Sequence, residues 1–395
     1  MSIPILSAAE LRRAVLLRDL TDPEQGSHAM QLLIASLIQS LVDAWGTELV
    51  VRRASPIVSV ADNYDRLGYA GDAVARDARY TRYVCDGAVL RTQTSAIVPP
   101  LLTELACAPL RDVLLVCPGI VYRRDAIDRL HSGEPHQVDL WRIRRGTPLG
   151  TPELEAMVAL VVQSVLPGVE HRTLAAEHPY TLDGLQIDVR LGQKWIEIGE
   201  CGLASPRLLS AAGHDDATVS GLAMGIGLDR LLMLRKAVPD IRLLRTTDER
   251  VSSQMLDLEQ YRPVSHQPAA IRDLSLIVDH PITSEEIGDR VREALGARAN
   301  AVEAVDMLQD TSYEKLPRTV VERLGLRPGQ RNILVRVVLR DLEHTLTSEQ
   351  ANELRDRVYA ALHRGERWEW ASRTRTQASA DGHCIGAAKG VPGTP

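Results

Sequence analysis

Six short runs of β-branched and aliphatic residues, each bounded by turn residues, constrain the fold of this chain most strongly. Runs of this length between turn residues are typical of β-strands. They are not separated by regularly repeated helices, as the strands of a parallel βαβ sheet would be. The sequence therefore predicts an antiparallel sheet, with strands near 49–51, 57–60, 113–117, 138–143, 186–189 and 195–198.

Helices are expected beside this sheet, which makes the predicted fold class α+β. Residues 28–45 place apolar side chains at helical spacing, and Gly46 ends the pattern. Residues 152–166 form a second predicted helix, with Thr151 as its N-cap and Pro152 in the first position.

A different order of elements begins near residue 262. It reads strand, helix, strand, strand, helix, at 272–278, 284–295, 301–308, 332–339 and 348–363. Thr283 and Thr347 each begin a capping-box motif. This order predicts a ferredoxin-like βαββαβ domain. The expected division is a first domain at 1–250, a linker at 251–262, the ferredoxin-like domain at 263–371 and a disordered tail at 372–395, which is rich in Ser, Thr, Ala and Gly.

Charge and cysteine usage exclude several classes of protein. The net charge of −6 argues against a globally basic nucleic-acid coat, though not against a local basic surface. The five cysteines lie far apart without CxxC spacing, so neither a zinc knuckle nor a disulfide framework is expected. No apolar run approaches the roughly 20 residues of a membrane span, and the N-terminal segment lacks a signal-peptide layout. We expect a cytoplasmic protein that does not bind membranes.

Phenylalanine is absent from all 395 residues, although nine Tyr and five Trp are present. A chain of this length ordinarily carries on the order of a dozen or more Phe. A GC-rich gene would favour Arg over Lys, but it would not remove Phe, which has a codon ending in C. The absence therefore needs an explanation of its own.

Two polar segments could carry chemistry. In residues 118–139, Arg123 follows a predicted strand, where its planar guanidinium suits a triphosphate; a surface hairpin with solvated charges is equally consistent. In residues 221–236, glycines and then Arg230 stand where a strand would give way to a helix. Such a junction can approach an anion closely, although a tight strand–helix turn is the simpler alternative.

Together these segments resemble motifs 2 and 3 of the class II aminoacyl-tRNA synthetases, and specifically the phenylalanyl-tRNA synthetase family. The resemblance covers about residues 26–250. The second domain resembles the anticodon-binding domain of the same family. This layout is similar to that of the single-chain, organellar-type enzyme, which implies a monomer. The matching stretches are 62–67, 90–95, 195–197, 201–202, 268–275 and 341–347.

The resemblance implies residues for ATP and Mg²⁺. Arg123 aligns with the arginine on the α-phosphate and Arg230 with the arginine on the γ-phosphate, so these two are the expected catalytic residues. Asp125 aligns with an acid that contacts the adenine amino group, and His131 with a histidine on the phosphate side. Glu197 is the expected Mg²⁺ ligand, because this hard cation prefers carboxylate oxygen.

The resemblance also implies an amino-acid pocket. Gln137 and Asp139 align with the residues that hold the substrate ammonium, and Ser95 aligns with a serine near the same group. The remaining residues expected to line the pocket for an aromatic amino acid are Gln93, His178, Tyr180, Glu200 and Ala223.

Several pocket positions depart from the family pattern. The family's Phe-Pro-Phe stretch reads His178-Pro179-Tyr180, a His is replaced by Gln93, and Glu200 stands where Gly is usual. Removal of Phe from the whole chain could explain Tyr180, but not Gln93 or Glu200, which replace other residues. The alternative is a pocket rebuilt for a more polar side chain.

The predicted tRNA contact is a local arginine run in the second domain. Residues 263–371 carry 15 basic and 18 acidic residues, so this domain is not basic overall. Arginines whose stems lie along a strand pair would give the same pattern, so the two interpretations stay open. The run consists of Arg318, Arg323, Arg327, Arg331, Arg336 and Arg340, with only Glu322 as an acid among them.

Three functions follow from these observations. The first is ATP-dependent activation of phenylalanine or an analogue as an aminoacyl adenylate, followed by transfer to tRNA. The Phe-free composition suggests a back-up or self-resistance form of such an enzyme, which could be made when charged phenylalanine tRNA is scarce. The second is a paralogue that activates a modified aromatic amino acid for biosynthesis. The third is a non-catalytic tRNA-binding protein.

Overall fold

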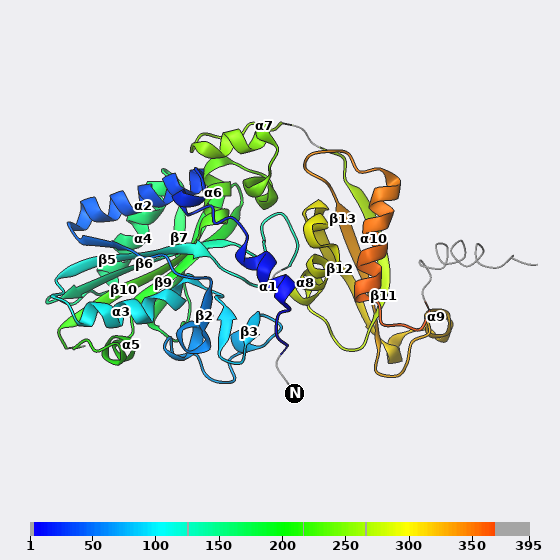
Figure 1. Ribbon diagram of the computed structural model, residues 1–395, viewed down its shortest axis with the longest axis horizontal. Coiled ribbons are helices and arrows are strands. Elements are labelled where there is room, and N and C mark those ends of the chain that lie inside the picture. The colour runs from blue at the N-terminus through cyan, green and yellow to red at the C-terminus, as the bar shows by residue number, and fades with distance from the viewer. Residues whose placement is uncertain (1–3, 125, 216, 265–266, 368–395) are drawn as a thin grey trace, which may run out of the picture. The chain divides into compact units, whose positions relative to one another are not determined.

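The computed structural model describes residues 4–124, 126–215, 217–264 and 267–367 (Figure 1). The chain forms two compact units that divide near residue 267, with residues 341–344 belonging to the first. None of the helices in the described ranges combines the length and the apolar character that a membrane span requires.

A seven-stranded sheet forms the centre of the first unit (Figure 1). Neighbouring strands are antiparallel, apart from the parallel edge pair β1–β5. The predicted antiparallel sheet and the α+β class are therefore confirmed. The strand order is β1 (Glu48–Val51), β5 (Asp112–Ile120), β6 (His136–Arg145), β10 (Val219–Gly227), β9 (Lys194–Ala204), β8 (Thr181–Leu191) and β7 (His171–Ala175).

The predicted strand at 57–60 does not join this sheet. It forms β2 (Ile57–Ser59) in a separate three-stranded sheet with β4 (Ala88–Leu90) and β3 (Tyr83–Cys85). Strands of only three residues pair through few hydrogen bonds, so the sequence pattern alone could not assign them to one sheet or the other.

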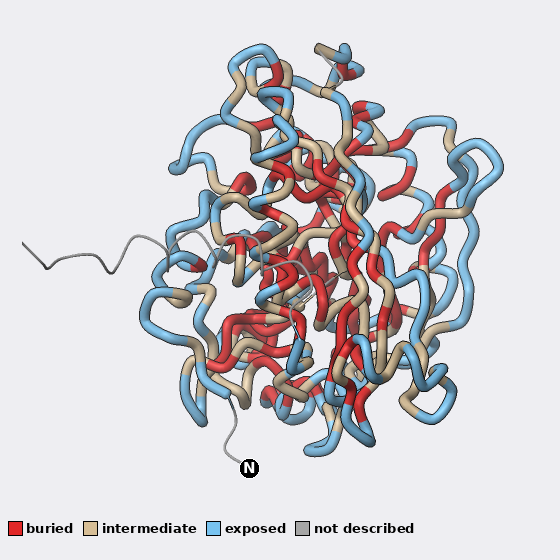
Figure 2. The backbone as a smooth tube through the Cα atoms, turned by 90° about the vertical axis from the view of Figure 1, so that its right-hand side faces the viewer, coloured by how far each residue is buried: buried red, intermediate tan, exposed pale blue. Residues whose placement is uncertain are grey.

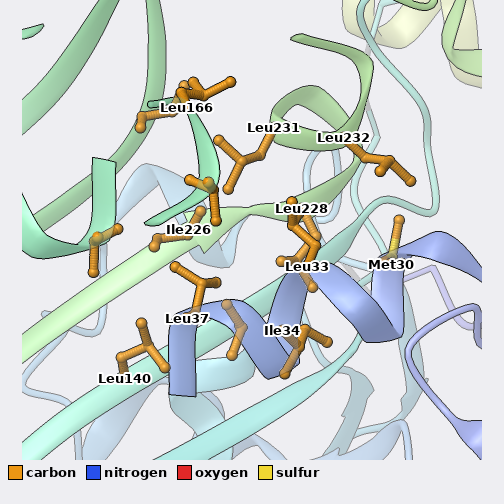
Figure 3. Close-up of a cluster of buried hydrophobic side chains, with 14 of the residues drawn as sticks. Met30, Leu33, Ile34, Leu37, Leu140, Leu166, Ile226, Leu228, Leu231 and Leu232 are labelled. Carbon is orange, nitrogen blue, oxygen red and sulfur yellow. The ribbon is translucent and has the colours of Figure 1, made fainter. Parts of the chain in front are cut away.

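One face of the large sheet packs on three helices, α2 (Ala29–Trp45), α4 (Thr151–Val165) and α6 (Leu228–Lys236). Figure 3 shows Leu37 of α2 beside Ile226 of β10, and both are fully buried. The opposite face packs on α3 (Val98–Ala106) and α5 (Pro206–Ala211). Buried residues gather in the interior, and much of the outer backbone is exposed (Figure 2).

Two local expectations change in the first unit. Helix α4 begins at Thr151, with Gly150 rather than Thr151 as its N-cap, because the Gly150 N–H donates to Glu153 Oε2 at 2.9 Å. The predicted linker at 251–262 overlaps the end of α7 (Glu249–Ser252), and its Val251, Met255 and Tyr261 are buried in the same core as α2.

The second unit has the predicted order of helices and strands, with one short helix added. Its three described strands lie in the antiparallel order β11-β13-β12. Thr283 and Thr347 cap their helices by accepting the N–H groups of Glu286 and Gln350. Residues 368–395, which include the predicted tail, lie outside the described residues. The elements are β11 (Ala270–Val278), α8 (Ser284–Leu295), β12 (Val302–Ser312), α9 (Arg318–Leu324), β13 (Arg331–Leu339) and α10 (Ser348–Leu362).

Leu37→Ala tests the importance of the α2 interface. Leu37 is 0% exposed, so its truncation leaves a cavity and should lower the free energy of unfolding by about 2–5 kcal/mol. Leu32→Ala on the same helix is the control, because Leu32 is 44% exposed. Urea denaturation followed by circular dichroism measures both. Equal losses for the two variants would contradict this packing.

Candidate active site

Strand β10 separates the core from the candidate site by the alternation of its side chains. Leu222, Met224 and Ile226 face the helical core, so Ala223, Gly225 and Gly227 face the other side of the sheet. These small residues leave space above the strand. A cavity of about 330 Å³ lies there and is lined by all three.

Two carboxylates lie on either side of Gly225, in the middle of the open face of β10. Gly225 is the register partner of Asp139 on β6 and of Glu200 on β9. Register partners point to the same face of a sheet, so both side chains stand beside the space that glycine leaves open.

The structure brings the predicted catalytic, ATP-binding and amino-acid-binding residues into this one cavity, with a single exception. Asp125, the predicted adenine contact, lies outside the described residues. The residues that line the cavity as expected are Gln93, Ser95, Arg123, His131, Gln137, Asp139, His178, Tyr180, Glu197, Glu200, Ala223 and Arg230.

Asp139 is a buried carboxylate held by three neutral donors. Its Oδ2 accepts from Thr94 Oγ1 at 2.6 Å, and its Oδ1 accepts from Ser95 Oγ at 2.8 Å and from Trp141 Nε1 at 3.0 Å. Burial raises the pKa of Asp139, although these hydrogen bonds act in the opposite direction. A cation bound at this carboxylate would offset the cost of burying its charge.

Two arginines line the cavity. Arg230 donates from Nη1 to the Glu197 carbonyl oxygen at 2.8 Å, and its Nη2 is 3.2 Å from His131 Nε2. Arg123 donates from Nε to the Thr92 carbonyl oxygen at 3.0 Å. Among the described residues, no acceptor is hydrogen-bonded to the two Nη groups of Arg123. These groups therefore suit an anionic ligand with several oxygen acceptors.

A β-bulge turns two glutamates toward the cavity. Register between β8 and β9 shifts so that Ile198 has no partner, and Glu197 and Glu200, three residues apart, both line the cavity. Burial and the nearby Glu200 raise the pKa of Glu197, while Arg230 acts against them. Glu200 Oε2 lies 2.8 Å from His178 Nε2, and its interaction with His178 lowers the pKa of Glu200.

The aromatic rings of Tyr180 and His178 line the cavity, and two further rings lie close to Tyr180. The ring of Tyr180 lies 6.0 Å from that of Trp141, 6.4 Å from Tyr69 and 5.8 Å from His178. Tyr69 donates to Gln93 Oε1 at 3.2 Å, which fixes the Gln93 amide. Burial raises the pKa of Tyr180 well above its ordinary value, so this ring is uncharged at neutral pH.

A buried His136–Asp229 pair connects the two polar segments at 118–139 and 221–236. His136 is fully buried, and its Nδ1 lies 3.0 Å from Asp229 Oδ1. Burial would raise the pKa of Asp229, but His136 and Arg245 bring it below its ordinary value. Because Gln137 and Arg230 follow these residues in sequence, the pair fixes the start of β6 against the start of α6.

Sequence reasoning missed three residues of the site. Trp141 continues the alternation of Gln137 and Asp139 along β6, so the period-two pattern could have identified it. Thr94 adjoins the predicted Ser95, but nothing in its type distinguishes it. Tyr69 carries no sequence signal, because only the tertiary fold brings it to Gln93.

The predicted tRNA-binding arginines do not form one unpaired stripe. Arg331 and Arg336 lie on opposite faces of β13, as an odd sequence separation in a strand requires. Five of the six arginines pair with carboxylates: Arg318 with Glu322 (3.2 Å), Arg327 with Glu366 (2.7 Å), Arg331 with Asp310 (2.7 Å), Arg336 with Asp273 (2.8 Å) and Arg340 with Glu303 (2.5 Å). Their contact with tRNA, and that of Arg323, stays a prediction.

Asp139→Asn tests whether the buried carboxylate is kept for ligand binding at the expense of stability. A raised folded-state pKa means that the folded protein binds more protons than the unfolded chain, so stability falls as pH rises from the unfolded pKa through the folded one. The variant should lack this pH dependence and unfold at an equal or higher temperature at neutral pH. Calorimetry between pH 4 and 8 measures this, with Asp112→Asn, at a paired carboxylate outside the cavity, as control. A lower unfolding temperature at neutral pH for Asp139→Asn alone would contradict it.

Each of the two units matches a known protein family. Residues 20–255 match the family described as tRNA synthetases class II core domain (F), and residues 265–366 match the ferredoxin-fold anticodon binding domain. The chloroplastic/mitochondrial phenylalanine–tRNA ligase of Arabidopsis thaliana is 27% identical over 317 residues, which cover 77% of this chain and 68% of that protein.

Two further relatives cover different shares of the chain. The probable mitochondrial phenylalanine–tRNA ligase of Drosophila melanogaster is 26% identical over 370 residues, covering 79% of this chain and 77% of that protein. The phenylalanine–tRNA ligase alpha subunit of Nostoc punctiforme is 33% identical over 192 residues, or 49% of this chain, which spans only 56% of that subunit. Because the core-domain match extends over more than half of its length, the chain belongs to the family of class II tRNA synthetases with the core domain of type F.

Proposed function

We propose that this protein activates an aromatic amino acid, phenylalanine or an analogue of it, with ATP and transfers the aminoacyl group to tRNA. The observation that carries the proposal is the presence in one cavity of a buried carboxylate, Asp139, and two arginines, Arg123 and Arg230. A zwitterionic amino acid and a polyphosphate require these opposite charges a short distance apart.

The chemistry assigns a task to each end of the cavity. The carboxylate oxygen of the amino acid attacks the α-phosphorus of ATP, an aminoacyl adenylate forms, and pyrophosphate leaves. Arg123 would stabilise the charge that develops on the α-phosphate oxygens, and Arg230 and His131 would hold the leaving pyrophosphate. Gln137 and Asp139 would hold the ammonium group and so orient the attacking carboxylate. Asp125 remains the proposed adenine contact.

Magnesium fits this site through Glu197 and the nucleotide together. Among the described residues no group of three or more His, Cys, Asp or Glu could hold a metal ion. Mg²⁺ often takes one or two carboxylates and completes its shell with phosphate oxygens and water, and it would neutralise part of the triphosphate charge. The raised pKa of Glu197 beside Glu200 supports this assignment, because a nearby cation offsets the repulsion between the two carboxylates.

The second unit would supply the tRNA contact, since its matching family is an anticodon-binding domain. We propose that the chain acts as a monomer, which sedimentation analysis would test.

The Phe-free composition supports a back-up or self-resistance role. That role requires expression to rise during phenylalanine starvation or under a phenylalanine-directed synthetase inhibitor, and unchanged expression under both would rule it out.

Arg123→Ala should lower kcat/KM in amino-acid-dependent ATP–pyrophosphate exchange by about 10²–10³-fold, the usual cost of removing a donor that stabilises transition-state charge. Arg52→Ala is the matched control, because Arg52 is a half-exposed arginine paired with Glu104 outside the cavity. Exchange and tRNA acylation would be measured with phenylalanine and its ring-substituted analogues. Full exchange by Arg123→Ala would contradict the assignment, and ATP-independent tRNA binding without exchange would favour the non-catalytic alternative.

A further inference from the structure

A histidine and a glutamate lie against each other in the lining of the cavity. His178 and Glu200 both line it, with 2.8 Å between His178 Nε2 and Glu200 Oε2. The His178 side chain is 10% exposed and its Nδ1 lies 3.2 Å from Thr181 Oγ1, whereas the Glu200 side chain is 45% exposed. His178 therefore lies against one oxygen of Glu200, and the half-exposed carboxylate faces the open space.

The second oxygen of Glu200 has no assigned task within the protein. Among the described residues, Glu200 has no side-chain partner other than His178. His178, and to a lesser degree Arg123, lower the pKa of Glu200, and a carboxylate accepts hydrogen bonds and donates none. A free acceptor in a binding cavity selects for a donor on the ligand.

We propose that Glu200 accepts a hydrogen bond from the side chain of the substrate, so that the preferred amino acid is an aromatic one carrying a hydroxyl or amino group on its ring. This inference rests on the proposed function. The rings of Tyr180 and His178 line the cavity together with Glu200, and the ring of Tyr69 lies 6.4 Å from that of Tyr180. An unsubstituted ring placed there would remove water from the carboxylate without replacing its hydrogen bond, which is costly.

The two carboxylates beside Gly225 are suited to different ends of the substrate. Asp139 lies deep, and its oxygens already accept three hydrogen bonds. Glu200 lies on the other side of Gly225, two strand spacings or about 9–10 Å away between Cα atoms, and keeps one oxygen free. An aromatic amino acid whose ammonium is held by Asp139 and Gln137 would then extend its ring toward the side on which Glu200 and His178 lie.

The test is ATP–pyrophosphate exchange by the full chain with a matched set of amino acids. Tyrosine, meta-tyrosine and para-amino-phenylalanine carry a ring donor. Phenylalanine carries none, and para-methoxy-phenylalanine and meta-methoxy-phenylalanine offer only an acceptor. We expect kcat/KM for the best donor substrate to exceed that for phenylalanine by about 10²-fold or more, as is typical of sites built around a substrate hydroxyl. Its methoxy counterpart should be rejected at least as strongly as phenylalanine.

Variants test whether Glu200 causes the preference for ring-donor substrates over phenylalanine. Glu200→Ala should reduce the preference for the ring donor at least tenfold and raise kcat/KM for phenylalanine, because the ring no longer covers a charge. Glu200→Gln, which keeps a carbonyl acceptor, should retain more of the preference than Glu200→Ala. Glu177→Ala is the control, since Glu177 is an exposed acid that neighbours His178 in sequence but does not line the cavity.

The outcomes separate this inference from the proposed function. Equal use of phenylalanine and the donor substrates by the unmodified protein would overturn the inference and leave the synthetase function standing. An equal loss with every amino acid in Glu200→Ala would also overturn it, because Glu200 would then serve the ammonium or the metal ion. Absence of exchange with all amino acids would overturn the proposed function itself.

Discussion

The alternation of β10 is the constraint on which the rest of the first unit depends. The large residues at 222, 224 and 226 seal the core against α2, while the small ones at 223, 225 and 227 open the other face. The same strand pairs with β6 and β9, so its register also decides which side chains stand beside the opening. A shift of the strand register by one residue would turn the large side chains toward the cavity and the small ones toward the core. The burial of the large side chains therefore also fixes which residues line the cavity.

Electrostatics gives the two flanking carboxylates different properties. Burial raises the pKa of Asp139, whereas His178 lowers the pKa of Glu200. The same chemical group thus becomes a buried anion that is best compensated by a cation and a partly exposed anion that accepts hydrogen bonds. We infer that this difference lets one small cavity recognise both ends of a polar aromatic amino acid.

Much of the fold could be predicted because its signals are local. The helix over 28–45 ends at Gly46, whose φ of 63° lies in the left-handed region that glycine adopts without strain. The caps at Thr283 and Thr347 are formed between residues three apart, which sequence spacing fixes directly. The predicted N-cap of α4 was wrong by one residue, because the helix is capped at Gly150, whose own N–H donates to Glu153 Oε2, and no hydroxyl takes part.

The sequence by itself determined the types of elements, the alternation along β10 and the residues that resemble the synthetase motifs. Only the tertiary structure decided that His178 holds Glu200, that a bulge at Ile198 turns two glutamates into one cavity, and that Tyr69 fixes Gln93. It also paired five of the six predicted tRNA-binding arginines with acids, four of them on other elements. The physical reason is distance along the chain: propensity and capping act between neighbours, whereas strand register and side-chain pairing depend on which distant segments are buried together.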